Sequence, residues 1–418
     1  MKLRSALVLL SVGVLGSVQN SITLAQQSSA PRPLGVDDLF DFREAHDPQL
    51  SPDGQFVAFT VSSTSLKQDK SETRVYMVPF AGGDAIALTT EGVSSEQPRW
   101  SPDGKFLAFL SERKDAEGNK GKTQVYLLNR LGGEAQRLTD ATQDVEDFRW
   151  SPDGKRLVLV LRDPSPEDLE AAATKAEGEA EDKSITKKSK AQRPWVIDRL
   201  QFKEDTIGYL DSRRTHLYVF DLAAKSTTQV TSGDFDDSEP AWSPDGKLLA
   251  FVSNRSQPDP DANYNEDIWV VAASNTHKGA HPTQVTTNPG EDSHPAWSPD
   301  GKWITYSTQL DPKLFQYATK HIAVSPAAGG EAKVLTESFD RLAIEPRFAA
   351  DGKSIYSSPT MMARKFSARS VWPMAKSLGP SPVTSCSMVI PSRRMELLRP
   401  VFSPWIALLK STPLRAAS

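Results

Sequence analysis

The chain has 418 residues, of which 38% are hydrophobic and 24% are charged, and its formal net charge is −4. Hydrophobic content at this level is ordinary for a soluble globular protein. The small net charge gives no electrostatic reason to expect nucleic acid or an acidic membrane as a partner. The single cysteine, Cys386, excludes an internal disulfide framework.

The first 25 residues have the features of an export signal. Lys2 and Arg4 precede an apolar run, residues 6–16, that is too short to span a bilayer. Small residues at Thr23 and Ala25 predict cleavage after Ala25. A buried helix is the alternative. Because no later segment is apolar for long enough to cross a membrane, we expect an exported protein, periplasmic or secreted, with no membrane span after cleavage.

A repeated four-residue phrase organises the rest of the chain. Ser-Pro-Asp-Gly occurs five times, and a degenerate sixth copy reads Ala-Ala-Asp-Gly; the copies begin at Ser51, Ser101, Ser151, Ser243, Ser298 and Ala349. Four of the serines directly follow a tryptophan: Trp100, Trp150, Trp242 and Trp297. Successive copies start 50, 50, 92, 55 and 51 residues apart. The long interval fits either two periods or one period with an insertion.

The phrase predicts a tight turn that begins a strand. Proline fixes φ, aspartate bonds its own backbone, and glycine tolerates a positive φ. Apolar strands follow the turns, for example residues 56–59, 106–109, 248–251 and 303–306. A second strand comes next, for example residues 75–78, 125–128, 217–220 and 268–271. After a further turn, often Gly-Gly, a third short strand ends in Leu-Thr or Val-Thr, as at Leu138-Thr139.

Units of 40–50 residues with three or four strands are typical of propeller blades. One such unit cannot bury both of its faces, so the units must stack around an axis. We therefore predict an all-β fold over residues 36–356, a β-propeller of roughly six blades. A β-sandwich, or a string of small β domains, is the alternative.

Residues 164–193 interrupt the pattern. They are rich in Ala, Glu and Lys and almost free of large apolar side chains, which predicts a charged loop insertion. A lid or a docking arm is the functional alternative for this loop. The strand pattern is expected to resume at residues 195–197 and to continue through His216.

The composition changes after Tyr356. Residues 357–418 contain five of the seven Met, the only Cys, nine Lys or Arg and one acidic residue, Glu396. A natural basic tail is one interpretation. A frameshift is the other, because reading Met361 and Met362 in the shifted frame forces Asp-Gly, the turn dipeptide of the repeat. We expect residues 357–418 to be a non-homologous, frameshifted tail.

Two stretches resemble the propeller of the S9 (prolyl oligopeptidase-type) serine peptidases. One contains Val36-Asp37-Asp38-Leu39 and Asp47 to Gly54, and the other contains residues 194–200 and 208–218. The pattern is most similar to exported acylaminoacyl-peptidase-like and dipeptidyl-peptidase-like members. The resemblance implies an N-terminal propeller that covers an α/β-hydrolase domain. It also implies seven or eight blades, so six repeats predict an incomplete ring.

The catalytic motif that this resemblance implies is absent from the sequence. A nucleophile elbow would read G-x-S-x-G. Residues 92–96 lack the second glycine, and residues 379–382 in the tail also fail. We therefore expect no catalytic residue, a chain truncated before its catalytic domain, and no peptidase activity of its own.

Metal and cofactor sites are weakly indicated. His277 and His281 are spaced i, i+4, but Gly279 lies between them and Pro282 follows, so surface loop histidines are expected rather than a metal pair. The clusters at residues 234–237 and 259–261 match no calcium-binding loop, and solvated turns are expected. No phosphate-binding glycine loop or dinucleotide motif occurs. We predict no metal, no cofactor and no cofactor-binding residue.

Two functions remain open. The chain is either the substrate-gating propeller of an exported peptidase that acts on short peptides, or a stand-alone, TolB-like periplasmic propeller that binds other proteins. TolB-like proteins carry an α/β domain before their blades, and the short interval between residue 25 and the first repeat has no room for one. This favours the peptidase interpretation.

Overall fold

The computed structural model describes residues 33, 35–66, 69–113, 121–166, 168–169, 196–205, 208–361, 364–365 and 368–371. The predicted signal peptide, most of the predicted insertion and most of the predicted tail lie outside these residues. The chain divides into two compact units, Met1–Phe42 and Arg43–Ser418. In the first, a 3-10 helix, η1 (Val36–Asp41), begins where the Gly35 amide donates to Asp38 Oδ2 at 2.7 Å.

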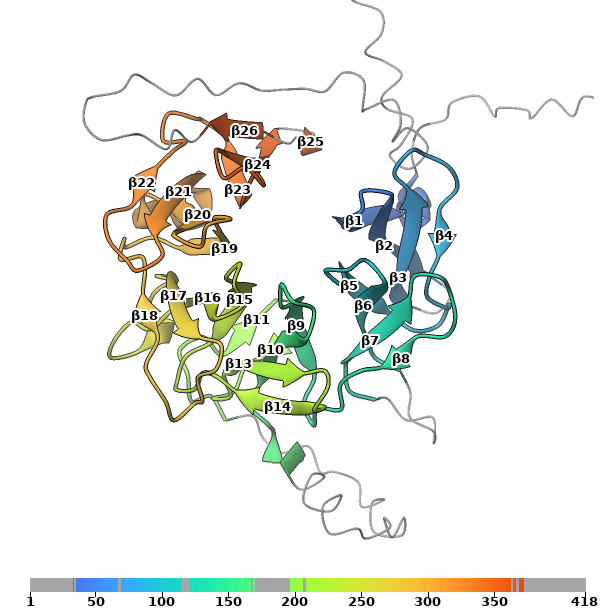
Figure 1. Ribbon diagram of the computed structural model, residues 1–418, viewed down its shortest axis with the longest axis horizontal. Coiled ribbons are helices and arrows are strands. Elements are labelled where there is room, and N and C mark those ends of the chain that lie inside the picture. The colour runs from blue at the N-terminus through green and yellow to red at the C-terminus, as the bar shows by residue number, and fades with distance from the viewer. Residues whose placement is uncertain are drawn as a thin grey trace, which may run out of the picture. The chain divides into compact units, whose positions relative to one another are not determined.

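The second unit contains six four-stranded antiparallel sheets in chain order, which are the blades of a propeller (Figure 1), and one two-stranded sheet. Blade 1 contains β1 (Glu44–Leu50), β2 (Phe56–Ser65), β3 (Lys70–Pro79) and β4 (Ile86–Ala87). Blade 2 contains β5 (Ser95–Trp100), β6 (Phe106–Ser111), β7 (Gln124–Asn129) and β8 (Gln136–Arg137). Blade 3 contains β9 (Val145–Trp150), β10 (Arg156–Arg162), β13 (Thr215–Asp221) and β14 (Ser226–Gln229). The predicted all-β propeller is confirmed.

Blades 4 and 5 repeat the same order, whereas blade 6 departs from it. Blade 4 contains β15 (Asp237–Trp242), β16 (Leu248–Ser253), β17 (Asp267–Ala272) and β18 (Thr283–Gln284), with η2 (Pro260–Ala262) between β16 and β17. Blade 5 contains β19 (Asp292–Trp297), β20 (Trp303–Gln309), β21 (Lys320–Pro326) and β22 (Lys333–Val334), with η3 (Pro312–Tyr317) after β20. Blade 6 contains β23 (Leu342–Phe348), β24 (Ser354–Met361), β25 (Arg364–Lys365) and β26 (Ala368–Val371), and both β25 and β26 pair with β24. Strand pairing in blade 6 thus runs past residue 356, the expected end of the propeller.

The repeated phrase forms the turn between the first two strands of a blade. In blade 2, Ser101 Oγ donates to Asp103 Oδ1 at 2.7 Å and accepts the Phe106 amide at 3.0 Å. The Lys105 amide donates to the same carboxylate oxygen at 3.1 Å, and Gly104 has a φ of 69°. Each residue type in the phrase therefore satisfies a backbone group or supplies a conformation that the turn requires.

The Leu-Thr and Val-Thr dipeptides have a related role. The short strand predicted at each dipeptide is present, but the threonine lies just beyond its end. The threonine hydroxyl accepts a backbone N–H from the neighbouring strand. Thr139 Oγ1 accepts the Val125 amide at 3.0 Å. Four other threonines make the same bond in their blades: Thr89, Thr231, Thr286 and Thr336.

The tryptophans before the phrase join consecutive blades. The indole N–H of Trp150 donates to the Arg99 carbonyl of blade 2 at 3.2 Å. Trp100, Trp242 and Trp297 make the equivalent bond to the blade before them. Blade 1 has Leu50 at this position, and its side chain is 54% exposed. Because no described N-terminal strand pairs with blade 6, the described propeller has no strand that closes its ring.

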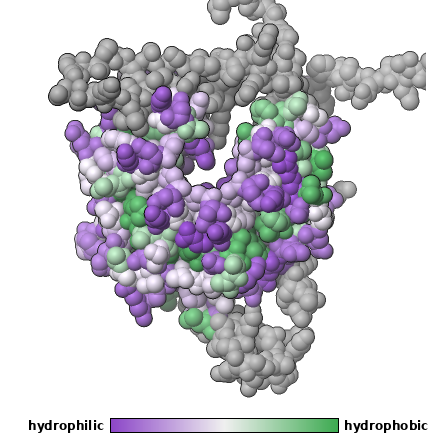
Figure 2. Space-filling model, viewed as in Figure 1, coloured by the Kyte–Doolittle hydropathy of each residue, from purple (hydrophilic) through white to green (hydrophobic). Residues whose placement is uncertain are grey.

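Apolar packing occurs between successive sheets. Ala58 and Val75 of blade 1 pack with Leu107 and Phe109 of blade 2, and each later pair of blades shares a similar buried cluster. On the face shown in Figure 2, hydrophilic residues predominate and hydrophobic residues lie scattered among them. Burial between blades is the expected stabilisation of a repeat protein, in which each unit contacts its neighbours.

The 92-residue interval holds one blade and an insertion. The strand expected at residues 195–197 is wrong for the two described residues. Val196 and Ile197 have no regular secondary structure and are 74% and 61% exposed, respectively. A short hairpin follows, with β11 (Lys203–Glu204) and β12 (Gly208–Tyr209). Ion pairs of Arg199, rather than strand pairing, hold this segment on the propeller.

Candidate functional site

The innermost strands place one polar residue of each blade at a β-bulge. Five of these residues have positive φ values between 48° and 57°, and each is followed by proline: Asp47, Gln97, Glu239, His294 and Glu345. The pairing register of the strand shifts at each of them. Positive φ is uncommon for residues other than glycine, and bulges redirect side chains. The recurrence in five blades indicates a position built to present polar groups.

A cavity of about 630 Å³ lies between the innermost strands of blades 3 to 6, β9, β15, β19 and β23. We call it the central cavity. Charged and polar side chains of both signs line it together with three of the blade-joining tryptophans: Asp147, Arg149, Glu239, His294, Glu345, Arg347, Trp150, Trp242 and Trp297. Cavities of this volume accommodate small ligands, and charges of both signs suit a ligand that carries both signs itself.

Two acid–base contacts join the innermost strands of neighbouring blades, and only the second lies in the lining of the central cavity. Arg99 of blade 2 is 2.6 Å from Asp47 of blade 1, and the His294 imidazole of blade 5 is 3.7 Å from Glu239 of blade 4. Burial, and then the neighbouring Arg149, lower the pKa of Arg99. Glu345 and Arg347 are exposed and form no ion pair with another described residue, so they remain open to a ligand.

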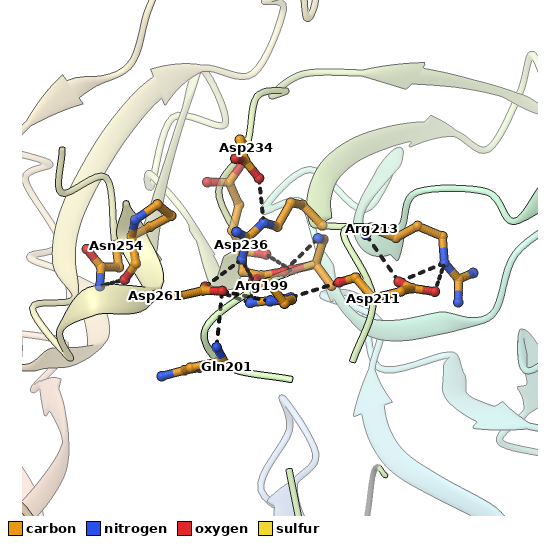
Figure 3. Close-up of polar contacts among 12 residues, drawn as sticks. Arg199, Gln201, Asp211, Arg213, Asp234, Asp236, Asn254 and Asp261 are labelled. Carbon is orange, nitrogen blue, oxygen red and sulfur yellow. Dashed lines mark hydrogen bonds and ion pairs between the residues drawn. The ribbon is translucent and has the colours of Figure 1, made fainter. Parts of the chain in front are cut away.

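A second cavity of about 540 Å³ lies among the connections of blades 3, 4 and 5. We call it the side cavity. Two arginines that follow the insertion, Arg199 (Figure 3) and Arg214, form part of its wall. Arg199 makes a bidentate pair with Asp261, with both N–O distances at 2.8 Å. Arg214 donates to Asp234 at 2.8 Å and to Asp236 and Asp261 at 3.0 Å.

These contacts correct the expectation of solvated turns at residues 234–237 and 259–261 for Asp237 and Asp261, whereas Asp234 is 77% exposed, as expected. Asp261 is only 7% exposed, and its bonds to Arg199 and Arg214 outweigh burial and lower the pKa of its carboxyl. Asp237 is fully buried and accepts from Arg255 at 2.7 Å. Sequence spacing missed these pairs because the arginines lie 18 to 62 residues away along the chain.

The other sequence candidates do not come together. His277 and His281 are both exposed, as expected for loop residues. Within the described ranges, no group of three or more His, Cys, Asp or Glu residues is arranged to hold a metal ion. Gly92 lies between β4 and β5, and its amide donates to Glu72 at 2.9 Å, whereas residues 379–382 fall outside the described part. No described helix has the length and apolar character to cross a bilayer.

Comparison with known proteins supports the repeat analysis. Residues 42–196 match the TolB β-propeller domain family. A stretch of 100 residues, 24% of the chain, is 29% identical to the uncharacterized peptidase YuxL of Bacillus subtilis (strain 168). That stretch covers 14% of the relative.

Solved peptidases share the fold. The uncomplexed acylaminoacyl peptidase of Pyrococcus horikoshii matches 79% of this chain and 45% of its own, with 16% identity and a TM-score of 0.54. An acylaminoacyl peptidase in complex with Z-Gly-Gly-Phe-chloromethyl ketone has the same coverage and identity and a TM-score of 0.56. The chain thus spans less than half the length of these peptidases. It is a β-propeller with the TolB-type repeat that resembles the N-terminal propeller of the S9 peptidases.

Proposed function

We propose that the chain is the substrate-admitting propeller of an exported serine peptidase for short peptides, without catalytic residues of its own. The observation that carries this proposal is the central cavity, with its acidic and basic side chains on the innermost strands. A short peptide has a cationic and an anionic end and fits a cavity of this volume. The peptidase resemblance supports the same substrate class.

Arg347 is the best residue with which to test peptide binding. Its guanidinium lines the central cavity and forms no described ion pair, so it is available to a peptide carboxylate. Arg347→Gln should weaken binding of a fluorescent tripeptide by about tenfold, the effect of losing one charge-assisted hydrogen bond. Fluorescence polarisation measures this, with Arg341→Gln as the matched control, since Arg341 is exposed and lies outside both cavities.

The two variants and an amidated peptide distinguish loss of the contact with the peptide carboxylate from a general loss of peptide binding. Amidation removes the carboxylate and should abolish the difference between wild type and Arg347→Gln. Equal affinities of all three proteins for the free-acid peptide would refute the role of the central cavity. Cleavage of an acylated chromogenic peptide, with labelling by a fluorophosphonate, would refute the absence of catalytic residues.

A stand-alone interaction module is the second candidate. The match of residues 42–196 to the TolB β-propeller domain family favours it. Such a module would retain a folded protein partner and would show no saturable binding of tripeptides. Parallel titrations with tripeptides, and affinity capture from the periplasmic fraction of the source cells, distinguish the two candidates.

Two further parts of the proposal concern the chain termini. Export predicts that the mature protein begins at Gln26, which N-terminal sequencing of the secreted product tests. The frameshift predicts an insertion or deletion in the gene, and sequencing the codons for Ser357 to Thr360 tests it. An unaltered frame with a stable 418-residue product would show that residues 357–418 are a natural tail.

A further inference from the structure

The repeated turns of neighbouring blades contact one another. A Cβ placed on Gly154 of blade 3 would lie 3.5 Å from Cδ of Pro102 in blade 2. The same contact joins the glycine and the proline of the other four pairs of turns: Gly104 and Pro52, Gly246 and Pro152, Gly301 and Pro244, and Gly352 and Pro299. The junctions between blades therefore have an equivalent space beside the turns, and the residues that fill it can be compared.

At the junction of blades 1 and 2, an arginine of the chain itself occupies this space. The Arg130 guanidinium lies over two rings, 4.6 Å from the centroid of Phe56 and 6.0 Å from that of Trp100. Its Nη1 donates to Asp53 Oδ2 at 2.6 Å, and its Nη2 donates to Gln55 Oε1 at 3.3 Å. Aromatic faces and carboxylates both bind guanidinium groups. This junction thus shows which side chain such a set of residues accommodates.

The junction of blades 2 and 3 has the same aromatic and acidic residues around a cavity. Phe106, Trp150 and Asp103 hold the repeat positions of the phenylalanine, tryptophan and aspartate of the first junction. They line a cavity of about 420 Å³, which we call the junction cavity. Trp150 also lines the central cavity. Among the described residues, no cation lies over the ring of Phe106 or Trp150.

A leucine replaces the arginine at this junction. The amides of Arg130 in blade 2 and Leu222 in blade 3 make equivalent bonds, to the carbonyls of Lys105 at 2.9 Å and Lys155 at 3.0 Å. The two side chains therefore start from equivalent points of their blades. Leucine is shorter than arginine and carries no charge, and Leu222 forms part of the wall of the junction cavity. Space for a guanidinium from another molecule thus remains.

One carboxylate oxygen of Asp103 is not used by its own turn. The turn bonds to Oδ1 through the Ser101 hydroxyl and the Lys105 amide. Asp53 also bonds its turn through Oδ1, and its Oδ2 is the atom that accepts from Arg130. Oδ2 of Asp103 is 3.2 Å from Lys105 Nζ, but the Lys105 side chain is 74% exposed. Because exposed ion pairs contribute little free energy, an incoming guanidinium can replace this lysine.

The other two junctions with a tryptophan differ from the junction cavity. Between blades 3 and 4, the Arg156 guanidinium is 4.9 Å from the Trp242 ring centroid and donates to the Gly246 carbonyl at 2.8 Å. Between blades 4 and 5, Trp297 lines a cavity of about 340 Å³, but Leu248 takes the place of the phenylalanine. An arginine over the tryptophan is thus a recurring arrangement, and the junction cavity has the residues for it without the arginine.

We propose that the junction cavity is a guanidinium site, which binds an arginine side chain on the surface of a protein partner. Phe106 and Trp150 stack on the guanidinium, and Asp103 Oδ2 accepts one of its N–H groups. Arginine is preferred to lysine, because a planar guanidinium stacks on rings while it donates to a carboxylate. The inference goes beyond the proposed function and does not depend on it, because the site uses neither terminus of a peptide substrate.

The test uses three fluorescent peptides and the full 418-residue chain. All three peptides are acetylated and amidated, and their central residue is arginine, lysine or citrulline, the uncharged analogue of arginine. Fluorescence polarisation should show that the arginine peptide binds about tenfold more tightly than the citrulline peptide, with the lysine peptide between them. Because these peptides have no terminal charge, Arg347→Gln should leave this preference unchanged, and its effect on free-acid peptides reports on the proposed function alone.

Two variants fill the cavity from within or strengthen it. Leu222→Arg supplies the arginine that blade 2 already has, and it should abolish the preference for the arginine peptide. Ala327→Arg is the matched control, because the Ala327 amide makes the equivalent bond in blade 5, and the preference should persist. Lys105→Gln removes the competing cation and introduces the glutamine of blade 1, so the arginine peptide should bind about threefold more tightly.

Several outcomes would overturn the guanidinium site. Equal affinities for the arginine and citrulline peptides would do so, as would an undiminished preference in a Leu222→Arg protein that unfolds in urea as cooperatively as the wild type. Lys105→Gln changes an exposed side chain and keeps the test valid if Leu222→Arg does not fold. An affinity of Lys105→Gln for the arginine peptide equal to that of the wild type would also contradict the role of Asp103.

Discussion

Blades 4 and 5 carry an aspartate at the same position of the innermost strand, but only one of them has a charged partner. Asp237 and Asp292 are both fully buried. Asp237 accepts from Arg255 at 2.7 Å and lies 3.3 Å from His216 Nδ1. The nearest groups to Asp292 are neutral, namely the Asn288 amide at 3.1 Å and the hydroxyls of Thr286 and Thr308.

The register of the strands explains the difference. Asp237 is paired with Ser253 in blade 4, and Asp292 is paired with Thr308 in blade 5. Two residues after the paired residue, blade 4 has Arg255 and blade 5 has Leu310. Burial raises the pKa of Asp292 to about 7, and that of Asp267, on the adjacent strand of blade 4, to about 6. One repeat position thus holds an ion-paired carboxylate in blade 4 and, in blade 5, a carboxyl whose pKa is raised by burial.

The largest effect is expected at Asp237. Asp237→Asn leaves the buried Arg255 without its partner, which should lower the free energy of unfolding by about 3–5 kcal/mol. Urea unfolding followed by tryptophan fluorescence measures this. Asp234→Asn, at a carboxylate that is 77% exposed, is the control and should cost less than about 1 kcal/mol. A loss at Asp237 no larger than that at Asp234 would contradict the comparison.

The same substitution in blade 5 should have the opposite sign. The folded pKa of Asp292 lies above its ordinary value of 3.8, so its contribution to stability falls as pH rises from about 4 to about 7 and is then constant. Asp292→Asn should therefore stabilise the protein by about 2 kcal/mol at pH 8, and the difference should disappear near pH 4. Unfolding of both proteins at the two pH values measures it. Destabilisation at pH 8 would show that Asp292 is ionised and satisfied.

Thr286 contacts both carboxyls whose pKa values are raised, Asp267 and Asp292. Its hydroxyl donates to Asp267 Oδ1 at 3.0 Å and accepts the Ile268 amide at 2.9 Å. Thr286→Val should cost about 1–2 kcal/mol at pH 5 and more at pH 8, where Asp267 is ionised. Thr336→Val is the matched control, because Thr336 accepts the equivalent amide of Ile322. A cost that is the same at both pH values would show that the contribution of Thr286 does not depend on the ionisation of Asp267.

The smallest effect is expected from moving the arginine into blade 5. Leu310 is 41% exposed, so Leu310→Arg has space to direct its guanidinium toward Asp292. The new charge should lower the pKa of Asp292 and stabilise the protein at pH 8 by about 1 kcal/mol. Unfolding at pH 5 and pH 8 should show a weaker pH dependence than in the wild type. Leu310→Gln serves as the uncharged control and should leave the pH dependence unchanged.

Local motifs in the sequence predicted most of the fold. The Ser-Pro-Asp-Gly phrase identified the turns because its residues bond within six consecutive positions, as Ser101, Asp103 and Phe106 do. The innermost strands were not identified as separate elements, since bulges at residues such as Glu239 interrupt their alternation. The segment at Val196 and Ile197 resembled a strand because apolar residues run together there, although no neighbouring strand pairs with them.

The candidate site was less accessible to sequence reasoning. The proline that follows a polar residue in five blades is a visible repeat, and it marks the bulges of the innermost strands. Nothing in the spacing of Glu266, Arg199 and Asp261 indicated that they line one cavity. These residues lie on the connections between strands, whose lengths and sequences differ from blade to blade.

The sequence by itself determined the turns, the blade period and the all-β class, because these depend on bonds between residues close together in the chain. Only the tertiary structure decided which of two equivalent aspartates meets an arginine, and which carboxylates face a cavity. Charge pairs such as Arg199 with Asp261 form between different blades, 62 residues apart in sequence. Their free energy depends on burial and distance, which are fixed only when the blades stack.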